Sequence, residues 1–94
     1  MLTIAVDLDG TLTIEEVHWE NYLNAEPDID AILKINKKYD EGHKIIIHTA
    51  RPYGDWKVTT KWLKRFLVRY HCLVMGKLRA DLYIDNDSKR ISDL

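Results

Sequence analysis

The chain is poor in the residues that cross-link small proteins. It has one cysteine, Cys72, together with two prolines and four glycines among 94 residues. A single cysteine excludes an internal disulfide and a zinc site with four cysteine ligands, and it favours a reduced cytoplasmic protein with Cys72 as a small core residue. The composition, 46% hydrophobic and 31% charged, argues against a disordered or collagen-like chain.

Neither sign of charge is in excess, and long apolar runs are absent. The 14 basic and 15 acidic residues give a net charge of −1. Proteins that bind nucleic acid through bulk electrostatics usually carry a basic excess, so nucleic acid is not expected as a partner. No apolar run approaches the ~20 residues that span a bilayer, so no membrane association is expected. The residues up to Asp7 carry no basic segment, so we expect no signal peptide.

Short apolar segments alternate with helical patterns along the sequence. The length predicts one small domain, residues 1–94. Buried strands are predicted at residues 2–6, 44–48, 72–75 and 82–84, and helices at residues 29–41 and 56–71. Two crossovers that carry helices imply parallel strands joined by right-handed connections, which is an α/β fold.

Local signals set the expected ends of these helices. Asp28 is predicted to cap the first helix and Gly42 to end it, and Asp55 is predicted to open the second helix. In the second helix the aromatic residues recur every four positions and are expected on the packing face; they are Trp62, Phe66 and Tyr70. Its lysines and arginines are interpreted as a solvated face. Residues 12–28 are predicted to form a loop with a short hairpin or a turn of helix.

Polar clusters follow three of the four predicted strands. Asp7 and Asp9 follow the first strand, Thr49 and Arg51 the second, and Asp85 and Asp87 the last. The carboxyl ends of parallel strands meet at one edge of the sheet, where ligands bind in open α/β folds. The topology therefore gathers these side chains at one edge.

Clustered carboxylates repel one another unless a cation lies among them. Oxygen ligands without nearby cysteine or histidine favour a hard cation, Mg²⁺ before Ca²⁺ or Mn²⁺, and Mg²⁺ commonly accompanies phosphate substrates. Thr11, Thr49, the amides around Gly10 and Lys77 are candidates for binding phosphate oxygens. Asp7 and Asp9, two residues apart, offer a nucleophile and a general acid/base.

These motifs resemble those of the haloacid dehalogenase superfamily of phosphohydrolases. Asp7-Leu8-Asp9-Gly10-Thr11 after a strand is similar to its first motif, Thr49 to the second, Lys77 to the third, and residues 82–87 to the fourth. The resemblance covers residues 2–87 in the correct order. It implies a Rossmann-like parallel sheet of about four strands in the order 3-2-1-4, and Mg²⁺ as the cofactor.

The resemblance also implies a role for each matching residue. Asp7 would form an aspartyl-phosphate, and Asp9 would be the general acid/base. Mg²⁺ would be held by the Asp7 carboxylate, the Asp9 carbonyl and the Asp85 carboxylate. Thr49 and Lys77 would bind the transferring phosphoryl group. The predicted phosphate- and substrate-binding residues are, in full, Gly10, Thr11, Thr49, Ala50, Arg51 and Lys77. Arg51 is interpreted as contacting the leaving-group side of the substrate, with an ordinary surface arginine as the alternative. Within the superfamily, residues 49–52 and 80–85 resemble small capsule or polysaccharide biosynthesis phosphatases.

Two features depart from the superfamily pattern. Asn86 separates Asp85 from Asp87, so either Asn86 or Asp87 supports the metal ligand. Residues 12–27 are too short for a cap domain, so the core is expected to be minimal and capless. A small core, an uncovered last strand and three tryptophans lead us to expect a homo-oligomer.

The leading interpretation is therefore a Mg²⁺-dependent phosphatase that acts on a small phosphorylated metabolite such as a sugar phosphate. The alternatives are a phosphatase for nucleotide or polynucleotide ends and a non-catalytic module that binds phosphate or Mg²⁺. A receiver-type signalling domain fits less well, because its phosphorylated aspartate ends a middle strand, whereas the second strand here ends at Thr49.

Overall fold

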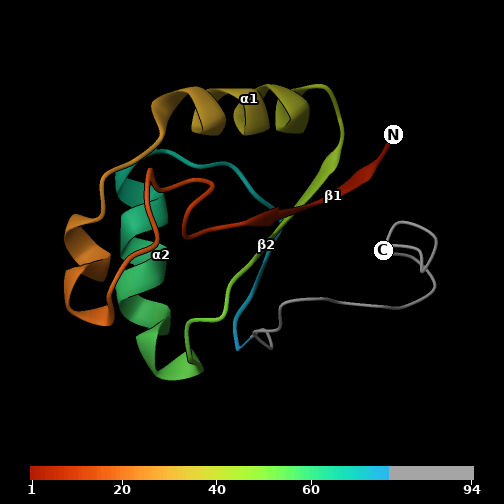
Figure 1. Cartoon of the computed structure of the whole chain (residues 1–94). Helices are drawn as coiled ribbons and strands as arrows, with labels where there is room; N and C mark the ends of the chain where they lie inside the picture. Colours follow the sequence, from red (N-terminus) through yellow and green to blue (C-terminus); the bar gives the residue numbers. More distant parts are fainter. Residues whose placement is uncertain (77–94) are drawn as a thin grey trace, which may run out of the picture.

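The computed structural model describes residues 1–76, which form a small parallel sheet with helices beside it (Figure 1). The elements in chain order are β1 (Thr3–Asp7), η1 (Trp19–Asn24), α1 (Ile29–Asp40), β2 (Lys44–His48), η2 (Tyr53–Asp55), α2 (Trp56–Arg65) and β3 (Cys72–Val74). The strand order is β1-β2-β3, and both pairings are parallel. The predicted α/β class and parallel sheet are confirmed, and the predicted strand at 82–84, with its place in the order, lies outside the described residues.

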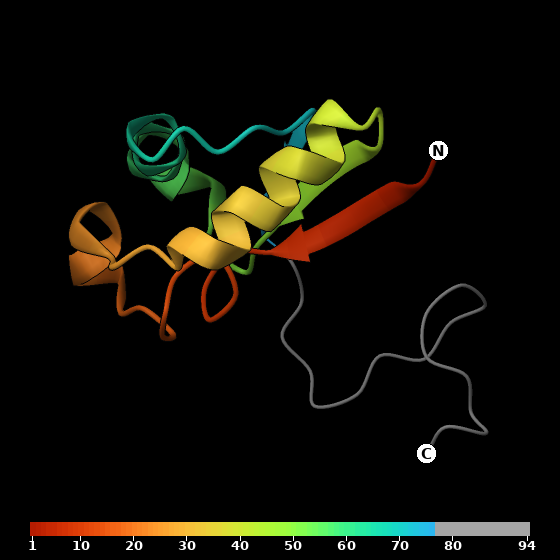
Figure 2. The ribbon, with the colours of Figure 1, turned by 90° about the horizontal axis from the view of Figure 1, so that it is seen from above.

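One face of the sheet carries the core. Val6 of β1 pairs with Ile47 of β2, and both are buried, as is Ile45 on the same face. Ile32 of α1 and Trp62 of α2 belong to the same apolar cluster, so both helices cover this face. Figures 1 and 2 show α1 and α2 on one side of the strands. Two right-handed crossovers that proceed in the same direction along a sheet produce this arrangement.

Helix α1 begins and ends where its local signals predict. The Asp28 side chain accepts a hydrogen bond from the Ala31 amide at 3.1 Å, which satisfies one of the free donors of the first turn. The helix ends at Asp40, and Gly42 follows with φ +95°, a conformation that glycine adopts without strain.

Helix α2 is shorter than predicted. It ends at Arg65, although the aromatic spacing extended the prediction to residue 71. Leu67 adopts φ +55°, its amide bonds to the Lys64 carbonyl, and the Val68 amide bonds to the Leu63 carbonyl. This is a Schellman ending, in which a leucine occupies the position usually held by glycine. The sequence therefore lacks the usual stop signal.

Helix α2 begins at Trp56, directly after Asp55, as predicted. Asp55 makes no side-chain capping hydrogen bond and instead ends the short helix η2. Its amide bonds to the Pro52 carbonyl at 2.9 Å, so a turn of 3-10 helix leads directly into α2.

The segment between β1 and α1 packs on α2. The isolated bridge between Thr13 and Pro27 closes this segment, and η1 lies within it, so the expected loop with a turn of helix is confirmed. The fully buried Trp62 donates its indole N–H to the Ala25 carbonyl at 2.9 Å. This hydrogen bond fixes the segment against α2. Figure 1 shows η1 beside that helix.

In the described part of the chain, no helix is both long and apolar enough to cross a membrane. Cys72 is exposed, whereas the sequence interpretation placed it in the core. The reason is its position on β3, where its neighbour Leu73 takes the place on the core-facing side of the strand.

Candidate functional site

The loop after β1 is a tight turn built on one carbonyl group. The Leu8 carbonyl accepts hydrogen bonds from the amides of Thr11, Leu12 and Thr13, at 3.2, 2.8 and 3.1 Å. The Thr13 hydroxyl accepts from the Gly10 amide at 2.9 Å and donates to the Glu15 carbonyl at 2.6 Å. Leu8 and Leu12 are fully buried and anchor the turn to the core.

Glycine is required at position 10 of this turn. Gly10 has φ +79°, and an added Cβ would lie 3.3 Å from the Glu16 carboxylate. A residue with a side chain would be strained in this conformation. Thr13 was not among the predicted site residues; a small hydroxyl residue three positions after glycine is too common a pattern to mark it.

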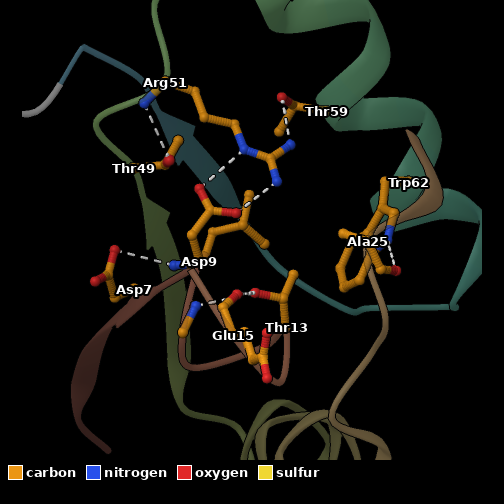
Figure 3. A network of polar contacts seen from close by, with 11 residues as sticks. Asp7, Asp9, Thr13, Glu15, Ala25, Thr49, Arg51, Thr59 and Trp62 are labelled. Atoms are coloured by element: carbon orange, nitrogen blue, oxygen red, sulfur yellow. Dashed lines mark hydrogen bonds and ion pairs between the residues drawn. The ribbon is translucent and has the colours of Figure 1, made fainter. Parts of the chain in front are cut away.

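The two aspartates of the turn have different surroundings. Asp7 ends β1, is half-buried, and accepts a hydrogen bond from the Leu8 amide at 3.1 Å. Asp9 is buried, with 6% of the residue exposed. Figure 3 shows the Asp9 carboxylate turned toward Arg51, while the Asp7 carboxylate points away from it. One carboxylate therefore lies at the sheet edge and the other within a polar network.

Arg51 is the centre of that network. Its Nε and Nη2 atoms donate to the two Asp9 carboxylate oxygens at 3.0 and 2.6 Å, and its Nη1 donates to the Thr59 hydroxyl at 3.1 Å. The guanidinium lies over the Tyr22 ring, 3.7 Å from its centroid. The Arg51 side chain is only 1% exposed, so the alternative that it is an ordinary surface arginine is wrong.

The predicted contact of Arg51 with substrate stays a prediction. Sequence reasoning missed Tyr22 and Thr59, because only the fold brings η1 and α2 to this arginine. No spacing or motif links residues 22, 51 and 59 in the sequence.

Thr49 follows β2 at the same edge as Asp7. The register pairs Asp7 with His48, so Thr49 lies one residue beyond the strand end. Thr49 is 1% exposed, and its hydroxyl accepts from the Arg51 amide at 3.2 Å, while its own amide bonds to the Val74 carbonyl. The predicted gathering of polar groups at the carboxyl ends therefore holds for the first two strands.

The remaining predicted residues are placed less fully. Gly10 and Thr11 lie in the turn after β1 and are exposed, and Ala50 is half-buried between Thr49 and Arg51. Lys77, Asp85, Asn86 and Asp87 lie outside the described residues.

The edge of the sheet offers single oxygen donors and no cluster of metal-ligating side chains within the described residues. Within residues 1–76, no group of three acidic, histidine or cysteine side chains is close enough to hold a metal ion. Mg²⁺ typically takes only one or two carboxylates and completes its shell with waters and substrate phosphates. The Asp7 carboxylate and the Asp9 main-chain carbonyl are oxygen groups that can bind such a cation. The Asp9 carboxylate is already paired with Arg51.

A groove of about 910 Å³ runs along α2 from η2. Its lining combines apolar side chains with lysines: Leu23, Gly54, Asp55, Lys57, Val58, Thr60, Lys61, Lys64, Val68 and Tyr70. Next to it, Tyr53 and Trp56 stack with their ring centroids 6.5 Å apart, and both are exposed. Lys57, Lys61 and Lys64 are exposed, as the predicted solvated face requires, and they also line this groove.

No protein-family model matches the sequence, and no curated protein matches it. Solved structures do resemble it. One is the crystal structure of a structural-genomics target from Vibrio cholerae, whose sequence is 30% identical to this one. The match covers 99% of this chain and 86% of that chain, with a TM-score of 0.75. At that identity and coverage, the chain belongs to the same family as this Vibrio cholerae protein.

A chain in the structure of the Pnkp1/Rnl/Hen1 complex also resembles this one. It is 21% identical, the match covers 85% of this chain and 30% of that chain, and the TM-score is 0.72. At this identity the likeness shows a shared fold.

Proposed function

We propose that this chain is a Mg²⁺-dependent phosphatase of the haloacid dehalogenase type that hydrolyses a phosphomonoester, such as a sugar phosphate, through an aspartyl-phosphate. The observation that carries the proposal is the turn after β1. It places Asp7 at the carboxyl end of a parallel strand, directly beside the end of β2 and Thr49. Ligands of open parallel sheets bind at this edge.

The residues divide the reaction as follows. A carboxylate oxygen of Asp7 attacks phosphorus, and the ester oxygen leaves with a proton from Asp9. Asp9 takes up this proton from water before the step, because both of its oxygens accept from Arg51 in the structure. Water then attacks the phosphorus of the aspartyl-phosphate and gives a proton to Asp9, while the bond between phosphorus and Asp7 breaks and inorganic phosphate is released. Thr49 and Lys77 bind the phosphoryl oxygens, because the amides of Gly10 and Thr11 already donate within the turn. The Asp7 carboxylate, the Asp9 carbonyl and Asp85 would hold Mg²⁺, which would offset the charge of the transferring group.

Hydrolysis of p-nitrophenyl phosphate tests this proposal. We expect phosphate release by the wild type with Mg²⁺, and a fall to background with EDTA or in Asp7→Asn. Asp30→Asn is the matched control, because Asp30 is an exposed aspartate in the first turn of α1, away from the sheet edge. Beryllium fluoride should form an aspartyl-phosphate mimic on the wild type and not on Asp7→Asn.

An inactive wild type that binds Mg²⁺ and forms no beryllium fluoride adduct would support a non-catalytic module instead. Full activity in Asp7→Asn would refute the mechanism.

A second candidate substrate is the phosphorylated end of a nucleotide or polynucleotide. The observation that favours it is the groove along α2, which Lys57, Lys61 and Lys64 line, with the stacked and exposed rings of Tyr53 and Trp56 next to its η2 end. Basic grooves with stacking aromatics suit single-stranded nucleic acid. A panel of sugar phosphates, nucleotides and phosphorylated oligonucleotides separates the two candidates by their kcat/KM values.

A further inference from the structure

We infer that Arg51 is a positioning residue for Asp9, and that Thr59 and Tyr22 hold Arg51 in place, so that α2 and η1 together set the direction of the Asp9 carboxylate. This inference rests on the proposed function, since it assigns Arg51 a part in the proton transfers of that same site. It differs from the expectation that Arg51 grips the substrate.

The contact between Arg51 and Asp9 fixes the plane of the carboxylate. Both carboxylate oxygens accept from different nitrogens of one guanidinium, at 3.0 and 2.6 Å. Such a two-pronged contact sets orientation as well as distance, whereas a single hydrogen bond leaves the carboxylate free to rotate. A carboxylate has about four lone-pair sites, so roughly two remain for a proton that moves to or from the reacting oxygen.

Arg51 is itself held on every side. Thr59 accepts from Nη1 at 3.1 Å, the Tyr22 ring covers the guanidinium face at 3.7 Å, and the backbone on both sides is fixed. The Arg51 amide donates to the Thr49 hydroxyl, and the Arg51 carbonyl accepts from the Gly76 amide at 2.8 Å. A surface arginine samples many rotamers. The Arg51 side chain is 1% exposed and bonded as described, so its rotamer is restricted.

A carboxylate that transfers protons must be held in place, because misplacing a reacting group by about 1 Å can cost ~10²-fold in rate. The proton that Asp9 donates speeds the reaction only when the leaving group is a poor one. An alkoxide needs a proton as it departs, whereas p-nitrophenolate leaves without one. Loosening Arg51 should therefore slow the hydrolysis of an alkyl phosphate far more than that of p-nitrophenyl phosphate.

Thr59→Val is the sharpest perturbation, because it removes only the hydroxyl that accepts from Arg51 and keeps the shape of the side chain. Thr60→Val is its matched control, since the next hydroxyl along α2 bonds only to carbonyls of its own helix, those of Trp56 and Lys57. Arg51→Lys is the second variant, because an ammonium cannot make the two-pronged contact.

The measurement is the ratio of kcat/KM for p-nitrophenyl phosphate to kcat/KM for ethyl phosphate with Mg²⁺. A ratio of two substrates on one preparation does not depend on the folded fraction, so a merely structural effect leaves it unchanged. We expect the ratio to rise about tenfold in Thr59→Val and about 10²-fold in Arg51→Lys, and to stay at the wild-type value in Thr60→Val.

A second readout needs no substrate. In ¹⁵N spectra the Arg51 Nε–H should exchange slowly with water in the wild type and in Thr60→Val, and faster in Thr59→Val. Equal losses for both substrates in Thr59→Val and Arg51→Lys would overturn the positioning role while leaving the proposed function intact. A wild type that hydrolyses neither substrate would overturn the proposed function and the inference that rests on it.

Discussion

The buried pair of Arg51 and Asp9 makes a prediction about folding stability that a double substitution can test. The side chains are 1% and 7% exposed, so removing one partner leaves the other charge in a site that water scarcely reaches. Breaking a buried pair in this way costs about 3–5 kcal/mol. A chain of this length has a free energy of unfolding of about 5–14 kcal/mol at the usual value per residue, so each single substitution removes a large share of it.

We expect Arg51→Met and Asp9→Leu each to lower the free energy of unfolding by about 3–5 kcal/mol. The double variant buries no charge and replaces both partners by apolar groups, so it should lose only about 1–2 kcal/mol, mainly through the Thr59 hydroxyl that loses its donor. The double variant is therefore predicted to be more stable than either single variant.

Urea unfolding followed by tryptophan fluorescence measures the three values, with EDTA present so that metal binding does not contribute. The control is Asp40→Leu, which removes the carboxylate of an exposed pair with Arg69 and should change stability by less than about 1 kcal/mol. If the loss in the double variant equals the sum of the two single losses, the buried pair is not the coupled unit described above.

Three smaller effects test other parts of the fold. Trp62→Phe removes the indole donor to the Ala25 carbonyl and part of a fully buried ring, and should lower the free energy of unfolding by about 1–3 kcal/mol in urea titrations. Asp28→Ala removes the hydrogen bond to the Ala31 amide and should cost about 1 kcal/mol in the same assay, whereas Asp28→Ser should restore most of it. Gly10→Ala forces a side chain into positive φ, so thermal denaturation should show a loss of about 1–3 kcal/mol, and an unchanged melting temperature would contradict the strained turn.

The sequence predicted the elements whose signals are local. The run Lys44–His48 was predicted with the bounds that β2 has, because a short β-branched segment between polar residues has few alternatives. Helix α1 carries its own cap at Asp28 and its own glycine at the end. The gathering of Asp7 and Thr49 at one edge followed from parallel topology alone.

The sequence could not predict what depends on contacts between distant segments. The end of α2 is one case, since Asn36 of α1 donates to the Leu67 carbonyl and accepts from the Arg69 amide, at 3.0 and 2.8 Å. These two hydrogen bonds stabilise Leu67 in the left-handed conformation. No local sequence pattern predicts this ending. The burial of Arg51 is another case, because its partners Thr59 and Tyr22 come from separate elements.

The backbone bonds of Arg51 have a consequence for cooperativity. Its amide is tied to Thr49 and its carbonyl to Gly76, so the ends of β2 and β3 and the turn that carries Asp9 share one point of attachment. Segments joined in this way open together, and local fluctuations of one are suppressed by the others. The amides of Thr49, Arg51 and Gly76 should therefore show the same opening free energy in native-state hydrogen exchange, close to that of the core strands. The edge of the sheet that carries Asp7 is then expected to open together with those strands.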